Sequence, residues 1–235
     1  MAAERTGNLV LDDLPAYVRN QCMGRGERVR VAIGEELVRQ DERATRTFFP
    51  ATAVAALTVE LKSGDKAEAG TVGREGFIGL AFLDARGVCP FSAVVRLPGE
   101  GYMVSQATLS SLMGKAVELR KAVLAYAGFT LNVVGRSIAC NAYHSLEQRL
   151  ARWLLTTHDH VDADEFPLTH EMLSQMLGAT RPRVSLAAGR LRKGRIIDYR
   201  RGQVTILDRA RLEERSCECY QSTYRALRTL PWVRT

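Results

Sequence analysis

The sequence predicts an α+β fold that consists of a β-rich N-terminal domain, a long helix and a C-terminal winged helix-turn-helix domain. Three observations support this prediction. Short apolar segments separated by turn residues occupy residues 27–104, a helical pattern of apolar residues runs through 109–157, and two helical patterns followed by a hairpin lie in 168–207. A chain of 235 residues is long enough for two domains. The expected parts are residues 1–114, 115–143 and 144–235.

The N-terminal part is expected to begin with a short helical lead-in over residues 1–24, where apolar residues recur at helical spacing. After residue 27 the pattern changes to short alternating or β-branched segments, separated by turns such as Ser63-Gly64-Asp65 and Pro98-Gly99-Glu100. Six or more short strands of this kind predict a β-barrel or sandwich. The expected strands are residues 28–33, 47–50, 55–61, 67–72, 91–97 and 101–104.

One side of the long helix carries apolar residues at alternating spacings of three and four, a pattern typical of a coiled-coil seam. Two glycines seven residues apart would let paired helices approach closely, although each costs about 1 kcal/mol in helix propensity. We therefore expect this helix to pair with a second copy of itself, the alternative being a core helix within one monomer. The residues expected at the dimer interface are Leu124, Ala127, Gly128, Leu131, Val134, Gly135 and Ile138.

The helical region is expected to break near His144, because Ser145-Leu146-Glu147-Gln148 has the Ser-x-x-Gln form of a capping box. A further helix over 146–157 should open the C-terminal domain. A polar acidic loop follows, after His158-Asp159-His160. The side chains of that tripeptide could bind a metal, but we expect them to form a helix end that is exposed to solvent.

Residues 168–207 predict a helix, a tight turn, a second helix and a basic hairpin. Thr169 can cap the first helix, and Gly178 can end it in the left-handed conformation. Thr180 is expected to cap the second helix, with Pro182 in its first turn. The second helix should bury one apolar side and expose a basic one. The buried positions are Val184, Ala187, Ala188 and Leu191.

After the second helix the apolar pattern changes to period two, interrupted by Arg200-Arg201-Gly202-Gln203, which predicts a two-stranded wing with a basic turn. A terminal helix of unassigned role is expected over residues 209–228.

The net positive charge is confined to the C-terminal part. Residues 1–164 contain 19 Lys and Arg against 19 Asp and Glu, whereas residues 165–235 contain 14 against 7. The segment from Arg181 to Arg201 alone holds 8 basic residues and one acid, Asp198. A solvated face usually mixes charges of both signs, so this concentration favours a surface that binds phosphates.

The segments Leu168-Thr169-His170-Glu171, Leu177-Gly178, Thr180-Arg181 and Val184-Ser185 occur in fixed order before the basic hairpin. This pattern resembles the DNA-binding domain of the Crp/Fnr family of bacterial transcription regulators. The resemblance implies a β-roll for the N-terminal domain, related to cyclic-nucleotide-binding domains. It also implies a homodimer, with double-stranded DNA and RNA polymerase as further partners. The alternative is a structural three-helix domain that binds no nucleic acid.

The resemblance assigns Arg181, and with it Ser185, to reading base edges in the major groove. Pro182 and Leu186 replace charged residues that some relatives use on bases, so the preferred operator should differ from theirs. Contacts to the DNA backbone are expected from Thr169, His170, Thr180, Arg183, Arg200 and Arg201.

The N-terminal resemblance rests on residues 72–80 and on the turn at Pro98, and it departs from the cyclic-nucleotide pocket of the family. Gly79-Leu80 stands where a Gly-Glu pair would hold the ribose, and Phe91-Ser92-Ala93 stands where Arg-Ser-Ala would hold the phosphate. A buried phosphate without its arginine would lack a charge-assisted bond worth about 1.5 to 3 kcal/mol. Cyclic AMP is therefore not expected as the effector, and no cofactor is expected.

The residues that could line a pocket for another effector are Arg74, Glu75, Leu80, Phe91 and Ser92. Core packing is the favoured alternative for Phe91, and a solvated ion pair is an equal alternative for Arg74 and Glu75. A signal at the β-roll would act by changing the position of the two DNA-binding domains relative to each other. A dimer that binds DNA without any effector is the other possibility.

Five scattered cysteines, no signal peptide and no apolar run of roughly 18 residues lead us to expect a cytoplasmic protein with reduced thiols and no membrane contact. Cys22 is the single cysteine near the N-terminus, where the iron–sulfur branch of the family has several, which argues against an iron–sulfur cluster. Cys217-Glu218-Cys219 offers two thiols without a second pair, so no metal site is predicted.

No nucleophile elbow, phosphate loop or zinc-ligand pair of useful spacing is present, so we do not expect an enzyme. A ligand-sensing regulatory protein that acts on a protein partner is the alternative function.

Overall fold

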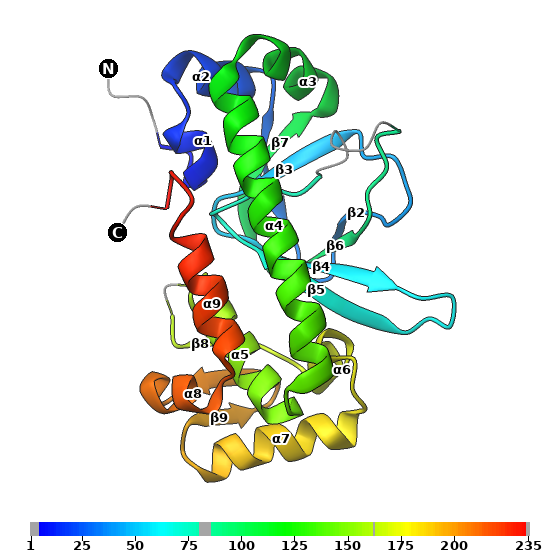
Figure 1. The fold of residues 1–235 in the computed structure, drawn as a ribbon, viewed down its shortest axis with the longest axis vertical. Coiled ribbons are helices and arrows are strands. Elements are labelled where there is room, and N and C mark those ends of the chain that lie inside the picture. Colours follow the sequence, from blue (N-terminus) through cyan, green and yellow to red (C-terminus); the bar gives the residue numbers. More distant parts are fainter. Residues whose placement is uncertain (1–4, 80–85, 162, 234–235) are drawn as a thin grey trace.

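The protein is described by a computed structural model over residues 5–79, 86–161 and 163–233 (Figure 1). The predicted α+β fold is confirmed, with an antiparallel β domain, a long helix and a C-terminal helix-turn-helix domain. Two short helices, α1 (Leu9–Asp13) and α2 (Ala16–Gly24), form the predicted lead-in.

Seven strands form the N-terminal domain as two antiparallel sheets. One sheet has the order β1-β7-β3 and the other has the order β2-β6-β4-β5. The predicted strands are all present, and the structure adds β2, which at three residues is too short to show a period in the sequence. The strands are β1 (Glu27–Val31), β2 (Glu36–Val38), β3 (Arg46–Pro50), β4 (Val54–Glu60), β5 (Lys66–Val72), β6 (Ser92–Leu97) and β7 (Gly99–Ser105).

Three helices follow the strands: α3 (Gln106–Lys115), α4 (Val117–Tyr143) and α5 (Leu146–His158). The capping box that separates α4 from α5 is present as predicted, because Ser145 and Gln148 exchange side-chain and backbone hydrogen bonds. Tyr126 of α4 is fully buried, and its ring lies 4.8 Å from that of Phe77. Burial of such an aromatic side chain fixes α4 to the N-terminal core.

The C-terminal domain contains α6 (His170–Leu177), α7 (Arg181–Lys193) and a three-stranded sheet of order β8-β10-β9. The wing is the hairpin of β9 (Ile197–Arg200) and β10 (Gln203–Ile206), and β8 (Glu165–Pro167) pairs with β10. A second core unites α5, α6, α7 and this sheet. Its most buried members are Leu150, Leu154, Leu155, Leu168, Leu173, Val184, Leu191 and Val204.

The predicted terminal helix is in fact two helices, α8 (Arg209–Arg215) and α9 (Glu218–Leu227). The chain leaves the helical conformation at Ser216 and Cys217, both of which are extended. Helix α9 runs beside α4 towards the N-terminal domain (Figure 1). Beyond it Trp232 is buried in the N-terminal core, and its indole N–H donates to the Glu75 carbonyl at 2.8 Å. The last helix and the tail therefore tie the two cores together.

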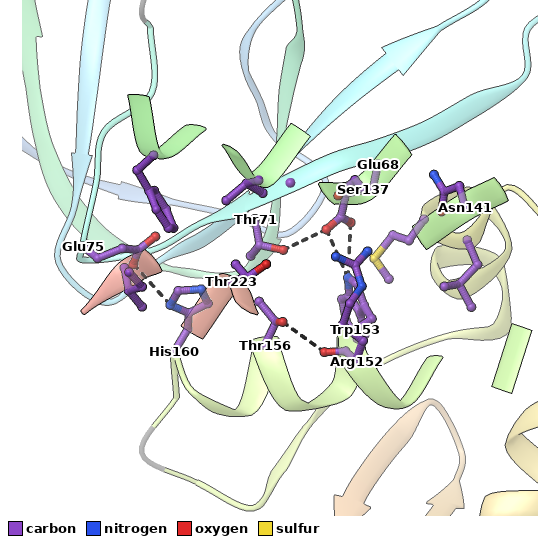
Figure 2. Close-up of a pocket in the computed structure, with 16 residues that line it drawn as sticks. Glu68, Thr71, Glu75, Ser137, Asn141, Arg152, Trp153, Thr156, His160 and Thr223 are labelled. Carbon is purple, nitrogen blue, oxygen red and sulfur yellow. Dashed lines mark hydrogen bonds and ion pairs between the residues drawn. The ribbon is translucent and has the colours of Figure 1, made fainter. Parts of the chain in front are cut away.

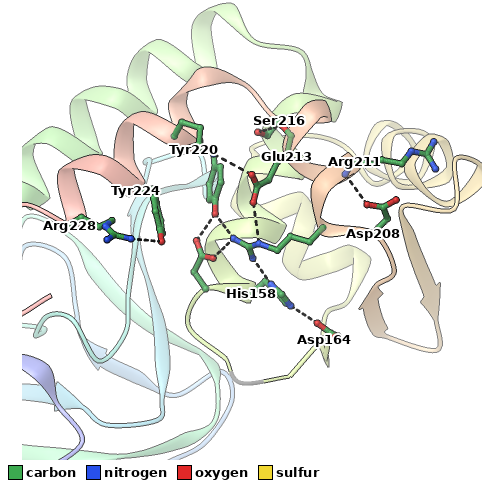
Figure 3. Close-up of polar contacts among 12 residues, drawn as sticks. His158, Asp164, Asp208, Arg211, Glu213, Ser216, Tyr220, Tyr224 and Arg228 are labelled. Carbon is green, nitrogen blue, oxygen red and sulfur yellow. Dashed lines mark hydrogen bonds and ion pairs between the residues drawn. The ribbon is translucent and has the colours of Figure 1, made fainter. Parts of the chain in front are cut away.

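A polar cluster fixes α8 and α9 against the end of α5 (Figure 3). The guanidinium of Arg209 lies 2.6 Å from His158 Nδ1, from Asp159 Oδ1 and from the hydroxyl of Tyr220. His158 Nε2 in turn lies 2.8 Å from Asp164 Oδ1. The expectation of a solvated helix end at residues 158–160 is therefore wrong, because an arginine 50 residues further along the chain covers it.

Candidate functional site

The helix-turn-helix geometry is set by three local interactions. The Thr169 hydroxyl accepts from the Met172 N–H at 3.1 Å and so caps α6, as predicted. Gly178 ends α6 with a φ of 54°, which a side chain would disfavour. Thr180 does stand at the N-cap of α7, but its side chain makes no capping hydrogen bond, so the predicted cap is wrong. The first turn of α7 is instead favoured by Pro182.

Helix α7 has one buried and one exposed side. The four apolar positions predicted to pack inward are all buried in the second core. The opposite side is exposed and lies at the end of the molecule away from α1–α3 (Figure 1). We call this side, together with the turn of the wing, the α7–wing surface. Its exposed members are Thr180, Arg181, Arg183, Ser185, Leu186, Arg190, Arg192, Lys193, Arg200 and Arg201.

The turn of the wing places two guanidinium groups beyond the sheet. Arg201 and Gly202 have φ values of 51° and 77°, the left-handed pair found in tight two-residue hairpins. Glycine adopts this conformation at no steric penalty, and an arginine there is strained. Because Arg201 stands in the turn of the hairpin, its side chain is exposed.

Several of the basic side chains form exposed ion pairs. Arg181 pairs with Glu171 of α6, while Asp198 lies 3.2 Å from Arg192 and 2.8 Å from Arg200. Such pairs contribute about 1 kcal/mol or less, so phosphate groups can replace them. Arg183 and Arg201 form no ion pair with any residue that the structure describes.

Tyr199 belongs to this surface and was not predicted. Its ring stacks on that of His170 at 4.7 Å between centroids, and His170 Nδ1 lies 3.5 Å from the Ser185 hydroxyl. These three residues come from β9, α6 and α7. A tyrosine at an inward-facing strand position gives no sequence signal for this contact, because the partner is set only by the packing of α6 on the wing.

The predicted dimer seam is a stripe of apolar side chains on the open side of α4. Leu124, Leu131 and Ile138, each seven residues apart, are 64%, 74% and 68% exposed. A Cβ added at Gly128 or Gly135 would contact nothing within 4 Å. Ala127 and Val134 are half-buried beside the stripe. By length and composition α4 is apolar enough to cross a membrane, but its other side packs on the N-terminal core and α9, whereas the stripe is uncovered.

The residues expected around an effector are not brought together. Arg74 is exposed, and Glu75 is buried against His160. Phe91 packs against the N-terminal core, while the Ser92 hydroxyl donates to Glu36 Oε1 at 3.0 Å. Leu80 lies outside the described residues. Arg74 and Glu75 line one pocket together, beside Asp159 and His160, and neither Phe91 nor Ser92 lines that pocket.

A small cavity lined by both polar and apolar side chains lies where β5, α4, α5 and α9 meet (Figure 2). Its volume is about 60 Å³, room for a few waters and well below the roughly 300 Å³ of small-molecule sites. Trp153 Nε1 donates to Glu68 Oε1 at 3.2 Å, and the Thr71 hydroxyl donates to the same oxygen at 2.8 Å. Burial raises the pKa of Glu68. The Trp153–Glu68 contact joins the N-terminal domain to the first helix of the C-terminal domain, and Thr71 orients the Glu68 carboxylate within β5.

The second buried contact between the domains is the ion pair of His160 with Glu75, at 3.3 Å and with both side chains less than 10% exposed. Burial alone would lower the pKa of His160, but the charge of Glu75 outweighs it, so that this pKa is raised. Burial would raise the pKa of Glu75, but the charge of His160 and the Gly73 N–H lower it. Each group therefore favours the charged form of the other.

The chain also contains a cluster of cysteine and histidine side chains that was not predicted from the sequence. Cys140 and His144, at the end of α4, meet Cys217 and Cys219, at the start of α9. The sequence did contain a signal, since Cys140 and His144 stand four apart and so lie on one side of a helix.

Residues 148–215 match the family model of a Crp-like helix-turn-helix domain. A search of curated proteins found no match. FixK2 from Bradyrhizobium japonicum has a similar structure, with a TM-score of 0.70 at 18% identity over 82% of this chain and 98% of that chain.

Two further solved structures are similar over most of the chain. The c-di-GMP responsive global regulator CLP of Xanthomonas campestris has a TM-score of 0.64 at 15% identity, over 82% of this chain and 99% of that one. A CRP/FNR-family transcriptional regulator from Thermus thermophilus has a TM-score of 0.64 at 17% identity, over 80% and 97%. At these identities the likeness establishes the fold.

Proposed function

We propose that this chain, which has the Crp/Fnr fold and a Crp-like helix-turn-helix domain, is a homodimeric transcription regulator that binds a pseudo-palindromic DNA site. The observation that carries the proposal is the α7–wing surface. A helix of this size fits the major groove of B-form DNA, and its exposed side carries guanidinium groups suited to base edges and phosphates. RNA polymerase is the partner through which such a regulator would act.

Arg181 and Ser185 are the proposed base-reading residues. Both are exposed and stand in the N-terminal half of α7, the part of a recognition helix that meets base edges. The ion pair with Glu171 holds the Arg181 guanidinium at this end of the helix. An arginine in this position can bind the O6 and N7 atoms of guanine together.

The proposed contacts to the DNA backbone surround the reading residues. Thr169 uses its hydroxyl oxygen as a cap acceptor and keeps its hydrogen for a phosphate. Thr180 and Arg183 flank Arg181 at the helix start, and Arg200 and Arg201 extend the contact along the wing. His170 offers the ring nitrogen that does not face Ser185.

The proposed dimer forms through the apolar stripe of α4. A stripe that repeats every seven residues matches the periodicity of a two-helix coiled coil. Dimerisation would cover large apolar side chains that are otherwise in water, and the two glycines leave room for the partner helix. Two α7 helices would then bind successive major grooves about one helical turn apart.

Control of the dimer by a signal other than cyclic AMP is part of the proposal. The Glu36 carboxylate beside Ser92 would repel a cyclic phosphate, and Phe91 offers no charge to offset it. Titration calorimetry with cyclic AMP should show no binding at micromolar concentration. Micromolar binding would overturn this part of the proposal.

Selection of duplexes from a random library by the full-length protein tests the proposed function. We expect recovery of a two-fold symmetric site whose affinity falls steeply with salt. The alternative, a ligand sensor that acts on a protein partner, would be supported if no duplex were enriched.

A further inference from the structure

Three cysteines and one histidine meet at the joint between α4, α8 and α9. Their ligand atoms, the sulfurs of Cys140, Cys217 and Cys219 and a ring nitrogen of His144, all lie within 4.8 Å of one another. The three cysteines are buried, and His144 is largely covered. Four side chains that each offer one soft or borderline ligand atom form the usual donor set of a structural zinc site.

The distances within the cluster fit tetrahedral coordination. Zn–S and Zn–N bonds of about 2.3 and 2.05 Å place two sulfurs about 3.8 Å apart and a sulfur and nitrogen about 3.6 Å apart. The Cys140 and Cys217 sulfurs lie 3.5 Å apart, and the Cys219 sulfur lies 3.6 Å from His144 Nδ1. The side chains are thus close to the required arrangement before any metal is considered.

The surroundings of the cluster also suit a metal. His144 Nε2 lies 3.2 Å from the carboxylate of Glu218, so the other ring nitrogen is oriented towards the sulfurs. A carboxylate behind a histidine ligand is a common second partner in zinc sites.

Charge is balanced around the cluster as well. Three thiolates, a neutral histidine and Zn²⁺ carry a net charge of minus one. The guanidinium groups of Arg149 and Arg152 on α5 lie near these cysteines, and their positive charge would offset this negative charge.

We propose that Cys140, His144, Cys217 and Cys219 bind one Zn²⁺ ion in a closed, four-ligand structural site. The site joins the end of the long helix to the two helices that follow the wing. Because α4 also carries the apolar stripe, the metal would fix the DNA-binding domain relative to that helix. Binding releases the thiol protons to solvent and involves no change of oxidation state.

The test is the metal content of the full-length protein, purified under reducing conditions without a polyhistidine tag or added chelator. We expect about one zinc and no iron per chain by plasma mass spectrometry. Replacement of zinc by Co²⁺ in the wild-type protein should give the strong visible bands of tetrahedral cobalt and a thiolate charge-transfer band. This readout does not depend on a variant that folds.

Variants separate the cluster from the other cysteines. Cys217→Ser should lose the bound zinc, whereas Cys22→Ser and Cys89→Ser, at buried cysteines elsewhere, should retain it. Glu218→Gln should weaken zinc binding roughly 10-fold or more in competition with a chromophoric chelator. The matched control Glu214→Gln, an exposed glutamate on α8, should not.

Less than about a tenth of a zinc per chain, together with no cobalt charge-transfer band, would overturn the proposal. So would a Cys140–Cys217 disulfide in metal-free protein isolated from reducing conditions, because it would show that the pair serves redox chemistry.

Discussion

Arg181 is the residue on which sequence discrimination is expected to depend. Arg181→Ala should lower the affinity for the selected operator by about 1–3 kcal/mol, because a bidentate contact to guanine is lost, and should change nonspecific binding little. Fluorescence anisotropy with operator and scrambled duplexes at one salt concentration measures both affinities. The matched control Glu171→Gln removes only the ion-pair partner of Arg181 and should preserve the preference for the operator. An unchanged ratio in Arg181→Ala would contradict the assignment.

Arg200 is expected to act on the phosphates alone. Arg200→Ala should weaken binding to all duplexes alike and should reduce the slope of log affinity against log salt by about 0.9, because one fewer counterion is released. Arg225→Ala removes the same charge from an exposed site on α9 and should leave both quantities unchanged. A sequence-dependent loss in Arg200→Ala would instead place this side chain on a base.

The His160–Glu75 pair gives stability a defined dependence on pH. The raised pKa of His160 means that its contribution is complete below about pH 6.5 and is lost as pH rises through the pKa of the folded state. The lowered pKa of Glu75 means that its contribution is present above about pH 4.3 and is lost as pH falls. The pair should therefore stabilise most between about pH 4.3 and 6.5, with Asp159 supporting the charged histidine and Arg74 opposing it.

Urea unfolding of the wild type and of His160→Gln tests this dependence. We expect the variant to be less stable by about 3 kcal/mol near pH 6, because Glu75 is left buried without its partner. The difference should shrink as pH rises past the pKa of His160 in the folded protein. A difference that stays constant from pH 6 to pH 9 would refute the ion pair.

At the scale of single elements, α4 provides the sharpest prediction. Leu131→Asp should convert the dimer to a monomer in sedimentation velocity, because it places a charge in the middle of the apolar stripe. Affinity for the operator should fall with it. Leu61→Asp alters another exposed leucine, in the loop after β4, and this variant should remain dimeric. If the Leu131→Asp variant were still a dimer, the interface would not lie on the apolar stripe of α4.

Elements with local signals were predictable from the sequence. Ser145 and Gln148 form the expected capping box, and Gly178 takes the expected left-handed conformation, because both depend on neighbours within a few residues. The wing was equally clear from Arg201 and Gly202. The proposed DNA contacts follow from the same local motif, and the exposure of Arg181, Arg183 and Ser185 is compatible with the roles proposed for them.

Features that depend on distant contacts were missed. One local prediction also failed, because Thr180 stands at the N-cap of α7 but its side chain makes no capping hydrogen bond. The guanidinium of Arg209 covers His158 and Asp159, and the ring of Tyr199 stacks on that of His170. The sequence shows which side chains are polar, but their partners depend on tertiary packing.

At the scale of the whole molecule, the C-terminal segment couples the two cores. Helix α9 follows α4 back to the N-terminal domain, where Trp232 is buried and bonded to Glu75. The Glu68–Trp153 and Glu75–His160 contacts lie at the same junction (Figure 2). The DNA-binding domain is therefore held to the N-terminal domain by buried polar contacts as well as by the chain. A signal that changes the relative setting of the domains would have to alter these contacts.

The central claim is that two α7 helices, one from each subunit, bind base edges in successive major grooves. A chemical footprint of the full-length protein on its selected operator, combined with the mass of the complex, measures this most directly. We predict two chains per duplex and two protected half-sites whose centres lie about one helical turn apart. A monomer that protects no preferred sequence at moderate ionic strength would contradict the account.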